Sequence, residues 1–142
     1  MVYKRQIDLN HDKMSIFSSL FGSSENREEK TSKMNWNSLI DLGQLSEIIL
    51  LSSEKPVFIF KHSTRCSVSR MVLKQFESEF DLEDQVTPYF LDLLEHRAVS
   101  NAIAERFNVV HQSPQLLLIK NGMSVYDASH SAIDLAELRT KI

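Results

Sequence analysis

The residue best suited to chemistry is Cys66, the single cysteine in a chain of 142 residues. It follows an apolar run, Val57–Phe60, that is typical of a buried strand, and it opens a segment whose apolar residues have helical spacing. Backbone N–H groups at the start of a helix stabilise an anion, so we expect a nucleophilic thiolate at neutral pH. Three cationic side chains close by in the sequence, Lys61, Arg65 and Arg70, would add positive potential.

The alternative is that Cys66 is buried and inert and acts as a small hydrophobe. Its neighbours His62–Arg65 and Ser67 are polar, which favours an exposed turn over a core position. Three residues on, where a two-cysteine oxidoreductase holds its resolving thiol, the chain has Ser69. A serine hydroxyl can donate a hydrogen bond to a thiolate but cannot form a disulfide. The pattern therefore predicts exchange chemistry, in which the thiolate takes one half of a mixed disulfide and an external thiol resolves the product.

The elements that must position these residues alternate between strands and helices. The expected strands are Trp36–Ile40, Val57–Phe60, Val86–Leu91, Gln115–Lys120 and Met123–Tyr126, and the expected helices are Gln44–Ser52, Cys66–Glu79, Glu95–Phe107 and a last one lined by Leu135, Leu138 and Ile142. Pro88 inside the third strand indicates an edge position or a boundary error. Asn121-Gly122 predicts a tight hairpin, and Ser131 with Asp134 resembles a capping box at the start of the last helix.

This order predicts an α/β fold with a mixed sheet of four or five strands, covered by helices on both faces. A parallel stretch followed by a terminal hairpin and helix is the thioredoxin-like arrangement, a three-layer α/β/α sandwich. We expect this domain to span residues 35–142. Residues 1–34 are expected to form a flexible N-terminal extension, because Ser23–Lys33 is entirely polar and charged.

A second candidate feature is Ser113-Pro114, which directly precedes the strand expected at Gln115–Lys120. Local sequence favours a trans bond, because only about 5–6% of X-Pro bonds in folded proteins are cis. In a thioredoxin-like fold, however, a cis-proline at this point faces the active cysteine, and the residue before it offers backbone groups to an extended substrate. On this analogy we expect a cis bond, with the backbone of Ser113 facing the substrate.

Neither a metal site nor a tightly bound cofactor is expected. The spacing of the five histidines forms no metal-binding motif, and one cysteine excludes a zinc site built from several thiolates. His62 or His111 could lie near Cys66 and influence its protonation, although exposed or structural histidines are the ordinary case. Asp92 follows a strand and fits either a place beneath the site or a helix cap.

Composition bounds the class of protein. Hydrophobic residues make up 42% of the chain, which is typical of a globular protein. The 16 Lys and Arg against 19 Asp and Glu give a net charge of -3, which offers no electrostatic footprint for nucleic acid. Since no apolar run approaches the roughly 20 residues that cross a bilayer, no transmembrane segment is expected. One unpaired thiol fits a reducing compartment and predicts a cytoplasmic protein.

Two stretches carry a family resemblance. Residues 60–69 read F-K-H-S-T-R-C-S-V-S, and a second match runs from Ser113-Pro114-Gln115 to Lys120-Asn121-Gly122, with Ala128-Ser129-His130 after it. The first is similar to the F-K-H-S-T-x-C-x-x-S stretch of the YtxJ family, described as bacillithiol-system redox-active or monothiol bacilliredoxin-like proteins. The resemblance covers residues 35–142.

This resemblance implies a thioredoxin-like fold whose one active cysteine removes a low-molecular-weight thiol, bacillithiol, from oxidised protein cysteines. By position, Cys66 is then the nucleophile, Ser69 the replaced resolving position and Pro114 the cis-proline. The expected substrate-binding residues are Arg65, Ser67, Ser113 and Pro114. Family members often carry proline after the cysteine, where this chain has Ser67. The implied partners are S-thiolated client proteins, with bacillithiol, glutathione or another small thiol as co-substrate.

Two further functions stay open from the sequence. A thioredoxin-like binding or redox-sensing module would hold a partner, and its Cys66 would only become S-thiolated. A monothiol glutaredoxin-like iron–sulfur carrier would hold a cluster between two subunits. The chain lacks the C-G-F-S pattern usual in such carriers, which argues against this class.

Overall fold

The apolar runs of the sequence form one mixed sheet within residues 34–142, the part of the chain that the computed structural model describes. The strands are β1 (Asn37–Ser38), β2 (Val57–His62), β3 (Thr87–Asp92), β4 (Gln115–Lys120) and β5 (Met123–Ser129). Across the sheet their order is β1-β3-β2-β4-β5, with the first three parallel and β4 and β5 each antiparallel to the strand before it in this order. The expected N-terminal extension lies outside the described residues except for Met34, which is buried in the core.

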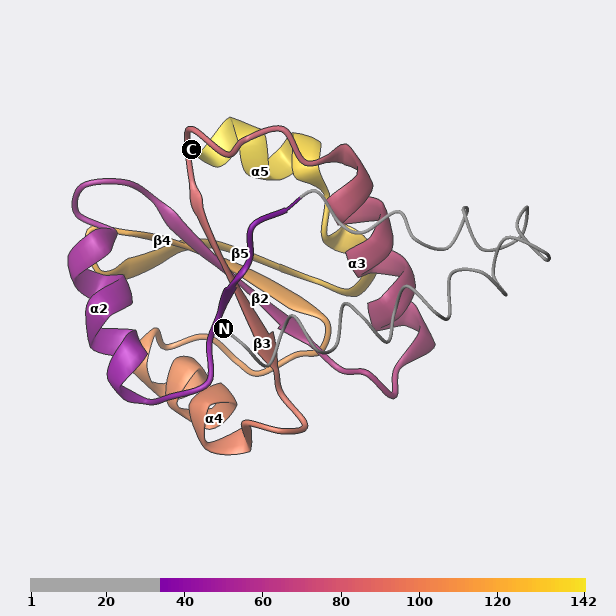
Figure 1. The fold of residues 1–142 in the computed structure, drawn as a ribbon, viewed down its shortest axis with the longest axis horizontal. Helices are drawn as coiled ribbons and strands as arrows, with labels where there is room; N and C mark the ends of the chain where they lie inside the picture. The colour runs from indigo at the N-terminus through magenta and orange to yellow at the C-terminus, as the bar shows by residue number, and fades with distance from the viewer. Residues whose placement is uncertain (1–33) are drawn as a thin grey trace, which may run out of the picture. The chain divides into compact units, whose positions relative to one another are not determined.

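The helices of the described residues cover both faces of this sheet (Figure 1). On one face lie α2 (Gly43–Leu51) and α4 (Arg97–Arg106), and on the other lie α3 (Ser67–Glu79) and α5 (Leu135–Lys141), which a short 3-10 turn, η2 (His130–Ala132), precedes. The three-layer α/β/α architecture expected from the sequence is confirmed.

Strand β2 is buried along its whole length because its side chains enter two cores in alternation. Val57 and Ile59 belong to the core beneath α2 and α4, whereas Phe58 and Phe60 belong to the core beneath α3 and α5. The rings of Phe58 and Phe60 lie 5.4 and 5.7 Å from the ring of Phe76 on α3. Aromatic pairs at this spacing stabilise beyond their buried area. They fix α3 along β2, and so fix where α3 begins.

The hairpin predicted at Asn121-Gly122 is confirmed. Both residues have positive φ, 51° and 76°, as a two-residue type I′ turn requires, and β4 and β5 pair antiparallel across it. The turn also rests on the end of α2, because the N–H groups of Asn121 and Gly122 donate to the carbonyl and hydroxyl oxygens of Ser52. Strand β5 continues to Ser129, three residues beyond its expected end, with an irregular register at Leu118/Ile119.

Pro88 does not mark an edge strand, because β3 contains it and lies between β1 and β2. Strand β1 pairs only with Tyr89 and Phe90, so within the described residues Pro88 has no strand partner on that side, where the Asn37 side-chain amide donates to its carbonyl. Thr87 donates its N–H toward β2, to Pro56. The next N–H along the strand would point the other way, where no partner strand reaches it. The proline is therefore tolerated inside the sheet.

The start of the last helix also differs from the prediction. Ser131 lies in η2, and the N-cap of α5 is Asp134, whose carboxylate accepts a hydrogen bond from the Ala136 N–H at 3.1 Å. The intervening Ile133 has extended backbone and packs against the second core, which separates the 3-10 turn from the helix. Aspartate is among the strongest N-cap residues, so it begins the helix directly.

The buried strand β2 contains a charged residue one position before its end. Lys61 is fully buried on the face of α2 and α4, the face that it shares with Val57 and Ile59. Burial lowers the pKa of Lys61 to about 8, from 10.5. The unfolded chain therefore binds more protons than the folded one between these two pH values, and the free energy of unfolding rises with pH across this window.

We predict that replacing Lys61 by Met removes this rise. The free energy of unfolding of the wild-type protein should increase by up to about 3 kcal/mol more than that of Lys61→Met between pH 8 and pH 10.5. Denaturant unfolding of both proteins at several pH values measures the difference, and other titrating groups cancel in the comparison. Parallel pH profiles of the two proteins would contradict the burial of an ammonium group at this position.

Candidate active site

Cys66 lies at the start of α3, as its N-cap residue. Its backbone is extended, its N–H donates to the Ser63 carbonyl at 3.2 Å, and its own carbonyl accepts from the Arg70 N–H at 3.1 Å. The first amide groups of a helix have no carbonyl partner within it, and the first turn of α3 contains no acidic side chain. The thiol is half-buried and therefore reachable. Cys66 therefore lies at a helix start, as the sequence predicts, and a helix start favours an anion.

The surface around the thiol is polar and cationic. Arg65 and Ser67 flank Cys66 in the chain, and both are exposed. Arg70, one turn along α3, is also exposed, and its guanidinium donates to the Thr64 carbonyl at 2.8 Å. This bond ties the loop between β2 and α3 to the helix that follows.

Ser69 joins the end of β2 to the first turn of α3. Its side chain is fully buried, and its hydroxyl oxygen accepts the Ser63 N–H at 3.1 Å and lies 2.8 Å from Nδ1 of His62. Burial lowers the pKa of His62, which outweighs the raising effect of the Asp92 and Glu77 carboxylates, so this imidazole is neutral at neutral pH. These contacts fix the loop that carries Cys66. The hydrogen bond expected from Ser69 to the thiolate stays a prediction.

The peptide bond between Ser113 and Pro114 is cis, which confirms the expectation from fold analogy over the one from local sequence. Pro114 is buried, and its carbonyl accepts from the N–H of His130, just after β5. Gln115, the next residue, pairs with Lys61 in the β2–β4 register. The start of β4 therefore lies beside the end of β2, the same end of the sheet from which the chain continues to Cys66.

The structure corrects the expected place of Lys61 and the helix-cap alternative for Asp92. Lys61 was expected to add positive potential near Cys66, but its ammonium group lies beneath α2 and α4, whereas α3 covers the other face. The Nζ of Lys61 lies 2.7 Å from Nδ1 of His111. His111, which could have lain near Cys66, therefore contacts this lysine. Asp92 is the last residue of β3, opposite His62 in the register, and its carboxylate accepts from the Leu94 N–H instead of capping α4.

Sequence reasoning missed the buried polar pair of Lys61 and Gln115. The sequence does contain a signal for this pair. Each residue adjoins a continuous apolar run, and side chains two positions apart in a strand lie on the same face, so each shares a buried face with apolar residues of its own strand. Lys61 was instead interpreted as a cation close to the thiol, and Gln115 only as the first residue of a strand.

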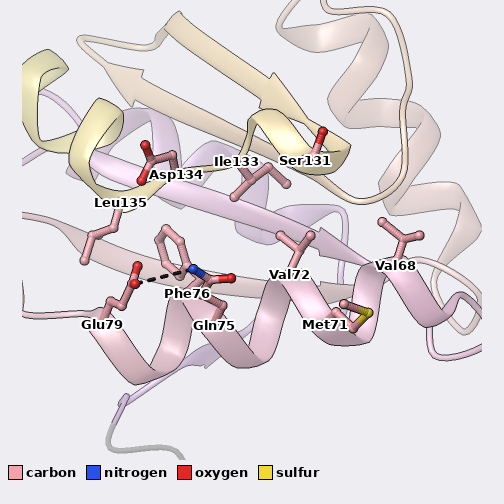
Figure 2. Close-up of a pocket in the computed structure, with 10 residues that line it drawn as sticks. All are labelled: Val68, Met71, Val72, Gln75, Phe76, Glu79, Ser131, Ile133, Asp134 and Leu135. Carbon is pink, nitrogen blue, oxygen red and sulfur yellow. Dashed lines mark hydrogen bonds between the residues drawn. The ribbon is translucent and has the colours of Figure 1, made fainter.

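A groove of about 500 Å³ runs along α3 from the side of the site (Figure 2). It is lined from α3 and from the segment of η2 and α5, by Val68, Met71, Val72, Gln75, Phe76, Glu79, Ser131, Ile133, Asp134 and Leu135. Val68 and Met71, two and five residues after Cys66, are 45% and 72% exposed. The groove therefore begins on the first turn of α3, although Cys66 itself is not among the residues that line it.

The described residues contain no group of three or more His, Cys, Asp or Glu side chains placed to share a metal ion. Among residues 34–142, no helix has the length and hydropathy that crossing a membrane requires.

Solved structures similar to this chain share the thioredoxin fold. A candidate oxidoreductase with a thioredoxin fold is 31% identical, with a TM-score of 0.63 over 72% of this chain and 89% of that one. Mitochondrial thioredoxin 3 from Saccharomyces cerevisiae is 18% identical, with a TM-score of 0.61 over 79% and 97% of the two chains. The Malassezia sympodialis thioredoxin Mala s 13, also 18% identical, has a TM-score of 0.60 over 78% and 90%.

Residues 37–138 match the family described as monothiol bacilliredoxin BrxC. This range contains Cys66, Ser69 and the cis-proline Pro114. The resemblance noted from residues 60–69 is confirmed at the level of this family, and with it a function in thiol redox chemistry. The chain therefore belongs to the monothiol bacilliredoxin family.

Proposed function

We propose that this protein is a monothiol thiol–disulfide oxidoreductase that removes a low-molecular-weight thiol, bacillithiol in the first place, from protein mixed disulfides. The observation that carries the proposal is a single reachable cysteine at the start of α3, with a buried serine where a resolving thiol would stand. Such a site can accept a thiol from a disulfide, but it cannot release that thiol by internal attack.

In the first step the Cys66 thiolate attacks the bacillithiol sulfur of the mixed disulfide. The bond between client and bacillithiol breaks, a new disulfide forms between Cys66 and bacillithiol, and the client leaves as a thiolate that takes up a proton. The number of disulfides does not change, so this step needs no oxidant or reductant. Cys66 is the N-cap residue of α3, and the free N–H groups of a helix start would stabilise the negative charge of the attacking sulfur.

In the second step an external thiol regenerates the enzyme. A second bacillithiol, as thiolate, attacks the sulfur of the bound bacillithiol, which yields a symmetric low-molecular-weight disulfide and the Cys66 thiolate. Over the full cycle one free small thiol is oxidised to the disulfide level, and one client cysteine is reduced to a thiol. The small thiol is a co-substrate in this scheme, and no tightly bound cofactor takes part. Such turnover suits the cytoplasm, where small thiols are kept reduced.

The substrate would lie across the end of the sheet. The backbone of Ser113, next to the cis-proline Pro114, is suited to pair with an extended client segment. Arg65 and Ser67 are exposed beside the thiol. A guanidinium at this place fits the carboxylates that bacillithiol and glutathione both carry.

We predict that the wild-type protein takes the thiol from an S-bacillithiolated test protein. Intact mass spectrometry should show one adduct on Cys66 and a client that has lost it, about tenfold faster than with free bacillithiol alone. Cys66→Ser should give neither change. A wild-type protein that becomes thiolated by a small disulfide, while the client keeps its adduct, would support a sensor and contradict the enzyme. If the protein takes glutathione from a glutathionylated client faster than bacillithiol from a bacillithiolated one, the preferred co-substrate is glutathione.

We also predict that Ser69→Cys converts the site to a two-cysteine centre. Positions 66 and 69 lie three residues apart at the helix start, so the new thiol can attack the Cys66 adduct and release the small thiol. The adduct should disappear about tenfold faster than in the wild-type protein, with an internal disulfide formed instead.

Ser69→Ala is the matched control, because it removes the same hydroxyl without adding a thiol. Its adduct should persist as in the wild-type protein, and the variant should lose about 1–3 kcal/mol of stability because the Ser63 N–H is left unpaired. Equal adduct lifetimes in all three proteins would show that release does not depend on a resolving thiol at this position.

A further inference from the structure

Lys61 is a fully buried cation, and its one hydrogen-bond partner in the described structure is His111. Within residues 34–142 no carboxylate lies within salt-bridge distance of its Nζ. An ammonium group only donates hydrogen bonds, so Nδ1 of His111 must accept, and its imidazole is neutral. Burial, and the nearby charges of Lys61 and Arg97, lower the pKa of His111, which agrees with this state. A buried cation costs stability unless it is paired, so core packing alone does not account for a lysine at this position.

Gln115 lies directly opposite Lys61 in the β2–β4 register and is also buried. Its amide nitrogen donates to the Val110 carbonyl at 3.0 Å, and its Oε1 accepts the Gln112 N–H at 3.2 Å. One pair of facing strand residues therefore contacts three consecutive residues of the loop, with Gln115 holding the two outer ones and Lys61 the middle one.

This loop leads directly into the cis-proline. Residues 110–112 immediately precede Ser113-Pro114, and all three of them are exposed. Val110, the apolar member, is 79% exposed. Apolar burial therefore does not hold the loop, and its conformation depends on the polar contacts from the sheet.

We propose that Lys61 and Gln115 are positioning residues that hold the 110–112 loop, and through it the Ser113-Pro114 backbone, in the conformation that receives an S-thiolated client protein. The inference rests on the proposed function and adds a determinant of protein-client binding at a distance from the thiol. Neither side chain touches the reacting sulfur. Their loss affects recognition of an extended peptide segment more than the chemistry of Cys66.

The test compares Lys61→Met and Gln115→Leu with the wild-type protein on two substrates. One is an S-bacillithiolated protein, and the other is a small symmetric disulfide that makes no contact with an extended groove. Both variants should raise KM for the protein about tenfold, while kcat, exchange with the small disulfide and Cys66 alkylation stay within about twofold. The double variant should show less than the sum of the two effects, because both residues act on one loop.

Hydrogen exchange gives a readout that does not depend on activity. The backbone N–H of Gln112 donates a hydrogen bond to the Gln115 side chain, so its hydrogen should exchange faster with solvent in Gln115→Leu. The same amide should also exchange faster in Lys61→Met, because both residues hold one loop. Lys120→Met is the matched control, since it replaces the half-buried lysine at the other end of β4 and should leave KM and the Gln112 amide unchanged.

An unchanged KM for the protein client in both variants, with normal wild-type exchange, would overturn the positioning role. An equal loss on both substrates would also overturn it, because that result indicates general destabilisation of the domain. No exchange by the wild-type protein with any mixed disulfide would instead overturn the proposed function, so the two failures are distinguishable.

Discussion

The constraint on which the site depends is the place of Cys66 at the start of α3, as the N-cap residue, beside the backbone N–H groups that open the helix. A thiol is a weak nucleophile until it loses its proton, and a helix start favours the charged form. The aromatic contacts of Phe76 with β2 fix α3 along the sheet, and Ser69 fixes its first turn to the end of that strand. The second core and one buried hydroxyl thus decide where the sulfur lies.

The opposite side of the site depends on the register of the antiparallel pair β2 and β4. Because Lys61 faces Gln115, the cis-proline directly before Gln115 comes to the same end of the sheet as Cys66, although 48 positions separate them in the sequence. Two polar side chains at that register position replace apolar residues. Burying these two polar side chains lowers core stability at the point where the sheet contacts residues 110–112.

Periodicity in the sequence was sufficient for the features that depend on near neighbours. The continuous apolar run of β2, the helical spacing of α3 and the Asn121-Gly122 turn each predicted their element. The cis bond at Pro114 needed the fold as well, since local preference points to trans. The sequence could not show that Lys61 is buried against His111, because that contact joins residues 50 positions apart. It misplaced the cap of α5 and left the position of β3 open between an edge and a boundary error. Both depend on segments that pack from elsewhere, the second core around Ile133 and the two-residue strand β1.

The most direct measurement of the central claim is the rate at which a small reagent such as iodoacetamide alkylates Cys66 at pH 7, in the folded protein and in the same protein unfolded in urea. The unfolded chain supplies the reactivity of this thiol without the helix start. We expect alkylation of the folded protein to be about tenfold faster, despite the partial burial of the thiol. Slower alkylation of the folded protein would mean that α3 shields an inert side chain, and it would contradict the account.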